Sequence, residues 1–310
     1  MFFPINQIVK NCSFFHKVIR FSFCIIMLYR KEGIAMEIHP VDKAINYALK
    51  KKETIDDSFF RYFVKAILAG IYIGFALMLC YRLAQPFFDI HSPATYMMTS
   101  LFFGLALVLI SYGGGELFTG NTMAFAMSTL SGATSWKDTI YNWVSTYFGN
   151  LVGALFFALL IYYSGLFSLV PKTTWLMDVA NSKMSATTVE LFVRGILCNW
   201  LVCLAIWIPM NVKGDVGKII ATLLIVFAFM ISGYEHSVAN MALFSIALIV
   251  PHPETITLAN ALHNLIPVTI GNIVGGAFFV GALNLYIFPK KKRKTNESSL
   301  RVTTPKSLAK

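Results

Sequence analysis

The chain has 310 residues, of which 56% are hydrophobic and only 13% are charged. A soluble domain carries about 25% charged residues, so this composition indicates that lipid surrounds most of the chain. The net charge of +11 lies in the tails and short loops rather than on one globular surface. This distribution is typical of a membrane protein and argues against nucleic acid as a partner.

Residues 1–35 do not read as a signal peptide. Phe21–Tyr29 is a mostly apolar run that is too short to cross a membrane. Charged residues follow it at once, and no small-residue cleavage site is present. Met36 begins a sequence typical of a cytoplasmic lead-in. We therefore expect translation to start at Met36, with residues 1–35 as an atypical extension.

Residues 36–58 form the expected cytoplasmic lead-in. Between residues 41 and 49, apolar side chains share one helical face: Val41, Ala44, Ile45, Ala48 and Leu49. This pattern predicts an amphipathic helix that lies along the cytoplasmic surface of the membrane. A short soluble linker helix is the alternative.

Six apolar stretches are long enough to cross a membrane, which takes roughly 20 residues. They cover Phe59–Leu83, Met97–Leu130, Tyr141–Phe167, Val189–Met210, Val216–Val250 and Leu262–Phe288. The second and fifth stretches are longer than one crossing requires, and both contain glycine and polar residues near mid-depth. The sequence therefore predicts an all-α membrane domain over residues 59–288, with a broken second and fifth helix, followed by a basic cytoplasmic tail over residues 289–310.

The basic residues predict the orientation of these six crossings, which place both termini on the same side. From Met36 onward, 17 Lys and Arg residues lie on the side of the termini. Only four lie on the other side: Arg82, Lys172, Lys183 and Arg194. Because cytoplasmic loops carry the excess of basic residues, both termini are expected to be cytoplasmic.

Three motifs recur in the same order in the two halves of the chain: 64–69 at 193–198, 114–121 at 233–240 and 149–154 at 271–276. Each half, residues 59–167 and residues 189–288, contains three of the predicted crossings. An odd number of crossings forces the second copy to insert upside down. The sequence therefore predicts a 3+3 inverted repeat with a pseudo-two-fold axis in the membrane plane.

The two long stretches each contain a break in the helical pattern, at Gly113–Gly120 and at Ser232–Ser237. Backbone that leaves the helix inside a membrane has to be buried in protein or line a cavity. Paired breaks at equivalent positions therefore point to a transport site. The half-helix after each break presents free N–H groups with partial positive charge, which suits an anion. No G-K-[ST] follows the triple glycine, so a phosphate loop is not indicated.

Polar residues at the breaks are the candidates for chemistry. Gly115, Glu116, Gly233 and Glu235 are expected to support the breaks. The two glutamates either accept hydrogen bonds from freed backbone or take part in transport, and the sequence leaves both roles open. His236 is the only histidine well inside an apolar stretch, and an ionisable group at that depth is a functional candidate. The five cysteines lack metal-ligand spacing, so no metal or cofactor is expected.

Four segments resemble the formate/nitrite transporter family: residues 116–120, 198–207, 232–241 and 267–272. The first two are more similar to the bacterial nitrite channels of this family than to its formate channels. The resemblance covers roughly residues 40–288. It implies an aquaporin-like protomer, a homopentamer with one pore in each protomer, and a place in the bacterial inner membrane.

The resemblance also implies roles for single residues. His236 is expected to be a central pore histidine, with Thr119 on the facing broken helix. Asn199 and Asn272 are expected to line the pore, and Lys183 its vestibule. Two apolar constrictions flanking the histidine are expected from Phe103, Leu107, Leu117, Phe118 and Phe229.

These residues predict transport of small monovalent anions, with nitrite as the first candidate and formate, hydrosulfide and lactate as rivals. Lys183 and the half-helix ends would concentrate anions, and the polar pore residues would replace lost water. His236 is a candidate for sharing a proton with the substrate, because histidine titrates nearest physiological pH. Burial favours the neutral ring, so its charge state is left open.

Two other classes of function were weighed. A channel for neutral solutes such as water, glycerol or ammonia fits the topology, but the sequence contains no Asn-Pro-Ala pair. An intramembrane enzyme is not indicated, because no H-E-x-x-H, no G-x-S-x-G and no paired membrane aspartates are present.

Overall fold

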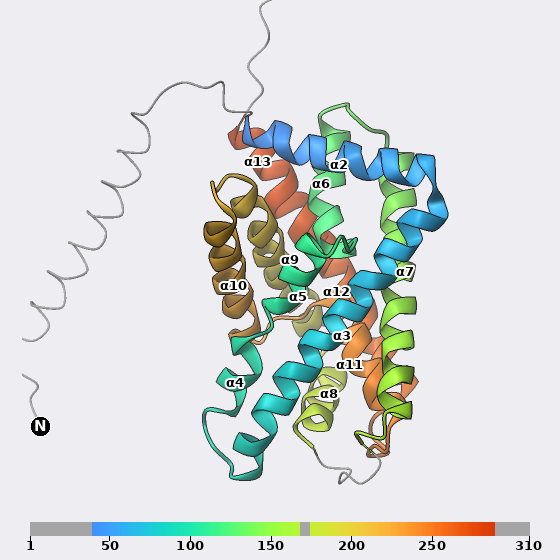
Figure 1. The fold of residues 1–310 in the computed structure, drawn as a ribbon, viewed down its shortest axis with the longest axis vertical. Coiled ribbons are helices and arrows are strands. Elements are labelled where there is room, and N and C mark those ends of the chain that lie inside the picture. Colours follow the sequence, from blue (N-terminus) through green and yellow to red (C-terminus); the bar gives the residue numbers. More distant parts are fainter. Residues whose placement is uncertain (1–38, 168–173, 289–310) are drawn as a thin grey trace, which may run out of the picture. The chain divides into compact units, whose positions relative to one another are not determined.

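The computed structural model describes residues 39–167 and 174–288, and every regular element in them is helical (Figure 1). In chain order the elements are α2 (Pro40–Asp57), α3 (Phe59–Asp89), α4 (Thr95–Leu101), α5 (Leu105–Tyr112), α6 (Phe118–Leu130), α7 (Trp136–Tyr163), α8 (Trp175–Ser185), α9 (Thr188–Met210), α10 (Asp215–Ile231), α11 (Ser237–Ile249), α12 (Leu258–Val274), the π-helical η1 (Gly275–Ala282) and α13 (Leu283–Ile287). The all-α prediction is confirmed for this part of the chain. The expected extension at 1–35 and the tail at 289–310 lie outside the described residues.

Within the described residues, five helical stretches are long and apolar enough to cross a membrane: Phe59–Asp89, Thr95–Tyr112, Trp136–Tyr163, Thr188–Met210 and Leu258–Ile287. The sequence predicted six. The predicted fifth stretch is divided between α10, with 17 residues, and α11, with 13. Neither half alone reaches the length of a crossing, because residues 232–236 between them are not helical.

Two helix pairs dominate the packing, α3 along α7 and α9 along α12. Glycine permits this closeness. A methyl group at Gly70 of α3 would collide with the backbone of Asn150, and one at Gly271 of α12 would collide with the backbone of Phe192. The two pairs come from equivalent positions in the two halves of the sequence, and they bring α7 and α12 beside the breaks.

The amphipathic helix is α2, which lies across one end of the helices, whereas α8 lies near the opposite end (Figure 1). Its predicted apolar face is buried, with Val41, Ala44 and Ala48 at 0% exposure. However, this face packs against protein, including Met123 of α6 and Trp207 of α9. The predicted apolar face of α2 is therefore covered by other helices of the same chain.

Candidate substrate pore

Two break loops interrupt the helical path, one between α5 and α6 (residues 113–117) and one between α10 and α11 (residues 232–236). The second residue of each loop is a glycine in the left-handed region, Gly114 at φ 77° and Gly233 at φ 71°. Glycine adopts this conformation without the steric cost that a Cβ atom brings. The two break loops therefore turn in the same way at equivalent positions of the repeated motifs.

The break loops are held by equivalent backbone hydrogen bonds. The N–H of Glu116 donates to the carbonyl of Lys65 at 3.0 Å, and the N–H of Glu235 donates to the carbonyl of Arg194 at 3.3 Å. Lys65 and Arg194 belong to the first repeated motif. In each half, the first repeated motif thus supplies a hydrogen-bond partner to the backbone of the break, because buried backbone groups need partners.

A single asparagine of α7 satisfies the first break. The Asn150 Oδ1 atom accepts a hydrogen bond from the N–H of Phe118 at 3.0 Å. Its Nδ2 atom donates to the carbonyls of Ala66 and Glu116, both at 2.8 Å. We call Asn150 with these three bonds the α6 clamp. The sequence analysis did not select this residue, although it lies in a repeated motif.

Asn272 of α12 makes the equivalent three bonds at the second break. Its Oδ1 atom accepts from the N–H of Ser237 at 2.8 Å, and its Nδ2 atom donates to the carbonyls of Gly195 at 2.8 Å and Glu235 at 2.9 Å. We call this set the α11 clamp. Asn272 was expected to line the pore. Instead, its side chain is fully buried, and backbone groups occupy both of its polar atoms.

The two half-helices meet at one hydrogen bond, between Thr119 Oγ1 and His236 Nε2 at 3.0 Å. The other ring nitrogen, Nδ1, accepts the N–H of Ala239 at 3.1 Å and so caps α11. A neutral ring that accepts at Nδ1 carries its hydrogen on Nε2. His236 therefore donates to Thr119, and the Thr119 hydroxyl hydrogen is left to donate elsewhere.

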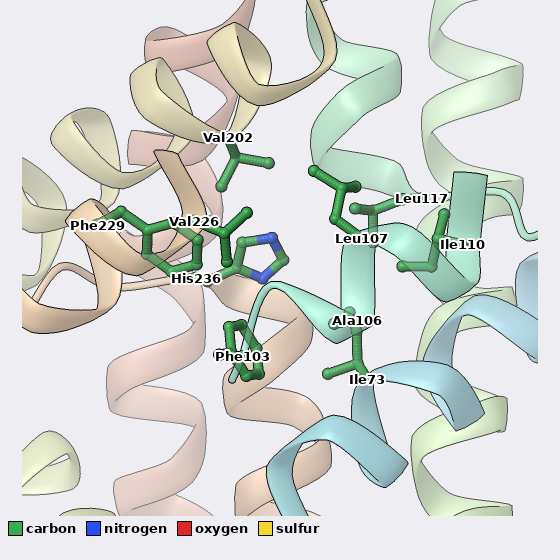
Figure 2. A pocket seen from close by; sticks show the side chains of 10 residues that line it. All are labelled: Ile73, Phe103, Ala106, Leu107, Ile110, Leu117, Val202, Val226, Phe229 and His236. Atoms are coloured by element: carbon green, nitrogen blue, oxygen red, sulfur yellow. The ribbon is translucent and has the colours of Figure 1, made fainter. Parts of the chain in front are cut away.

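His236 lines a cavity whose other lining residues are all apolar (Figure 2). They are Ile73, Phe103, Ala106, Leu107, Ile110, Leu117, Val202, Val226 and Phe229. Four of the five expected constriction residues are among them. The exception is Phe118, whose ring instead packs edge-on against Tyr147 at 5.0 Å. The five additional residues came to light only with the fold, since apolar residues are abundant in every span.

Asn199 of α9, also expected in the pore, lies behind Thr119. Its Nδ2 atom donates to the Thr119 carbonyl at 3.2 Å, to Thr122 Oγ1 at 2.9 Å and to the Asn272 carbonyl at 2.5 Å. It does not line the cavity. Its contacts tie the first turn of α6 to α12.

A second, polar cavity lies on the α8 side and is lined by Lys183, Arg194, Asp178 and Glu235 among others. Lys183 Nζ donates to Glu235 Oε1 at 2.8 Å. The other carboxylate oxygen of Glu235 accepts from Asn240 Nδ2 at 2.6 Å. Lys183, expected in a vestibule, thus lines this polar cavity, and its charge is opposed by the buried carboxylate of Glu235.

The first half contains a matching ion pair that the sequence analysis missed. Lys51 of α2 pairs with Glu116, and both side chains are buried. Tyr62 approaches the same carboxylate at 3.5 Å. Glu116 and Glu235 hold equivalent repeat positions. A lysine before the first spanning stretch, matching Lys183 before the fourth, could therefore have indicated this ion pair from the sequence. Among the described residues, no group of three or more His, Cys, Asp and Glu side chains is placed to hold a metal ion.

Comparison with known proteins shows to which family the chain belongs. Residues 39–286 match the family model described as formate/nitrite transporter. The chain belongs to the formate/nitrite transporter family. The relatives and structures described next are transporters and channels.

Two curated relatives and two solved structures show how similar the family members are. The chain is 46% identical to the uncharacterized transporter YwcJ of Bacillus subtilis (strain 168), over 79% of this chain and 96% of that protein. It is 39% identical to the nitrite transporter NirC of Escherichia coli (strain K12), over 75% and 85%. An FNT family ion channel superposes with a TM-score of 0.76 at 35% identity, covering 81% of this chain and 99% of the other. A pentameric formate channel with formate bound superposes with a TM-score of 0.63 at 31% identity, covering 74% and 98%.

Proposed function

We propose that this member of the formate/nitrite transporter family conducts small monovalent anions, with nitrite as its substrate. The observation that carries the proposal is the Thr119–His236 hydrogen bond, which lies between two half-helices beside an otherwise apolar cavity. At such a site, a small substrate can form hydrogen bonds at one point, and apolar side chains surround it elsewhere. A relative at 39% identity is a nitrite transporter, which supports nitrite as the substrate.

The apolar cavity sets the physical problem of transport. An isolated anion loses many kcal/mol of hydration there unless hydrogen bonds or a proton compensate. The His236 ring is the polar group among the lining residues, and the Thr119 hydroxyl is hydrogen-bonded to it. A substrate that leaves this point as the neutral acid crosses the remaining apolar wall at lower cost. We therefore propose that conduction is linked to a proton taken up from the aqueous phase with each anion, which forms the neutral acid at the His236–Thr119 pair.

The vestibule is the proposed entrance. Its lining includes two cationic and two anionic side chains, Lys183 and Arg194 with Asp178 and Glu235. Their formal charges balance, so the vestibule does not attract anions by net charge alone. An anion that binds Lys183 replaces Glu235 as its partner, and the positive ends of the half-helices add to the attraction.

We further propose the arrangement in the membrane. Six crossings form an aquaporin-like 3+3 inverted repeat, in which α4–α6 and α10–α11 are the broken second and fifth crossings. Both termini face the cytoplasm of a bacterial inner membrane, as the excess of basic residues favours. The functional assembly is a homopentamer, by likeness to the pentameric formate channel.

The test is anion flux into proteoliposomes, comparing nitrite, formate and chloride at two pH values. We expect nitrite to exceed formate, flux to rise with acidity, and His236→Phe to abolish most of it. His263→Phe is the matched control, because His263 is exposed and contacts only the backbone of Ala186 among the bonds described. Preference for formate would move the protein to the formate branch. Normal flux and pH dependence in His236→Phe would refute the mechanism.

A further inference from the structure

We propose that Asn150 is a positioning residue of the pore, which holds Thr119 at hydrogen-bond distance from His236. This inference rests on the proposed function, in which that pair meets the substrate. Asn150 is fully buried on α7 and lies outside the cavity lining. It touches the break loop and the residue directly before Thr119, so it acts through Thr119 and not on the substrate.

The first reason is that α6 has no capping side chain of its own. Its N-cap residue is Leu117, which makes no side-chain cap bond. The first N–H groups of a helix lack intrahelical partners, and Asn150 Oδ1 supplies one for Phe118. By contrast, α11 is capped by its own His236 as well as by its clamp. The orientation of α6 therefore depends more heavily on Asn150.

The second reason is that the two helices that carry the clamps, α7 and α12, are hydrogen-bonded to each other. Tyr147 of α7 and Thr269 of α12 are hydrogen-bonded through their hydroxyl groups at 3.1 Å. Each lies three residues before a clamp, Asn150 or Asn272. The clamps therefore fix α6 and α11 to neighbouring points of the same support. A small shift of either half-helix would lengthen the 3.0 Å Thr119–His236 bond beyond useful range.

The test compares Asn150→Ala with Asn150→Asp in the full-length protein. Alanine removes all three clamp bonds. The carboxylate keeps an acceptor for the Phe118 N–H, but turns an oxygen toward the carbonyls of Ala66 and Glu116. Once protonated, it can donate to one of them again. Protonation of the carboxylate is therefore expected to restore part of the clamp.

We expect Asn150→Ala to lower nitrite flux roughly tenfold or more at every pH, since misplacement of reacting groups by a fraction of an ångström is costly. Flux through Asn150→Asp, divided by that of the unmodified protein, should fall as pH rises from about 5.5 to about 8.5. Asn284→Asp is the control, because among the described residues the Asn284 side chain bonds within its own helical turn, to the carbonyl of Val280. Its flux ratio should stay flat.

Amide hydrogen exchange of residues 113–119 is the second measurement, and it needs no transport. Faster exchange there in Asn150→Ala, with residues 232–238 less affected, supports the clamp even if the protein conducts no anion. The proposed function would then fail while the positioning role stands. Unchanged exchange at 113–119, unchanged flux in Asn150→Ala, or a pH-independent flux ratio in folded Asn150→Asp would each overturn the proposal. If Asn150→Asp does not fold, the exchange and flux of Asn150→Ala decide.

Discussion

The two ring nitrogens of His236 have different tasks. Nδ1 accepts the Ala239 N–H and caps α11, whereas Nε2 reaches Thr119. A cationic ring needs a hydrogen on Nδ1, which would end the capping bond. As long as α11 keeps its cap, His236 acts as a neutral donor to Thr119, and the Thr119 hydroxyl hydrogen remains for another acceptor.

Thr119→Val tests this division directly, because valine keeps the shape and removes the hydroxyl. A buried donor left without an acceptor costs about 1–3 kcal/mol, and roughly 1.4 kcal/mol is a factor of ten in rate. We expect nitrite flux to fall roughly tenfold to a hundredfold, with Thr119→Ser retaining most of it. Proteoliposome flux provides the measurement, and equal flux through the valine and serine variants would contradict it.

The sequence identified the central residues but not all their supports. His236 was found because an ionisable group deep in an apolar stretch is rare, and Thr119 through the family resemblance. Asn150 and Asn272 look identical in the sequence, each within a Gly-Asn pair of a repeated motif. Whether such an asparagine faces a cavity or a freed carbonyl depends on how helices rotate against each other, which one sequence does not encode locally.

The α2 helix is joined to the channel by charge as well as by its apolar face. Lys51 pairs with Glu116 in the first break loop, and its Nζ atom lies 4.2 Å from the centre of the Tyr47 ring. Lys52 also reaches Asp138 at the start of α7, at 3.2 Å. The helix is therefore fixed to the loop that precedes Thr119, not loosely laid over it.

Lys51→Met should destabilise the protein strongly. It leaves Glu116 buried without its partner, and breaking a buried ion pair from one side costs about 3–5 kcal/mol. The double variant Lys51→Met with Glu116→Gln removes both charges, so its loss should be smaller than the sum of the single losses. Thermal unfolding in detergent gives the comparison, with exposed Lys50→Met as the control. Additive losses would contradict a direct pair.

At the scale of elements, the break loops were predictable and the docking of α2 was not. Glycine and polar residues at mid-depth have few roles in a membrane helix other than a break, so the α5–α6 and α10–α11 interruptions were expected close to where they lie. The apolar face of α2 was also predicted. Its partner was not, because lipid and protein present equally apolar surfaces to such a face.

Across the whole molecule, the two equivalent ion pairs differ in how far they are exposed. Glu116 and Glu235 each pair with a lysine from a short helix, α2 or α8. On the α8 side the pair borders the open polar cavity. On the α2 side, Lys51 is 5% exposed and Glu116 is 7% exposed, so α2 covers them. The repeat that we propose is thus symmetric in its bonds and asymmetric in its access.

The proposed orientation can be measured with single cysteines on these two helices. Glu53→Cys on α2 and Ser182→Cys on α8 are both exposed positions, whereas Cys80, Cys198 and Cys203 are buried. In intact spheroplasts, a membrane-impermeant thiol reagent should label the α8 position and spare the α2 position. The unmodified protein controls for its other thiols. Labelling of α2 alone would reverse the orientation.

The hydrogen bond between Tyr147 and Thr269 has a consequence for the origin of the fold. These residues are repeat mates, 122 positions apart like Asn150 and Asn272. A residue that touches its own mate lies on the axis relating the halves. Consider a dimer of two identical chains, each with one half and inverted relative to the other. In such a dimer, the same residue of both chains would make this contact, so one residue type would have to fit both sides. In a single chain the two positions can differ, and here one carries a phenol and the other a small hydroxyl.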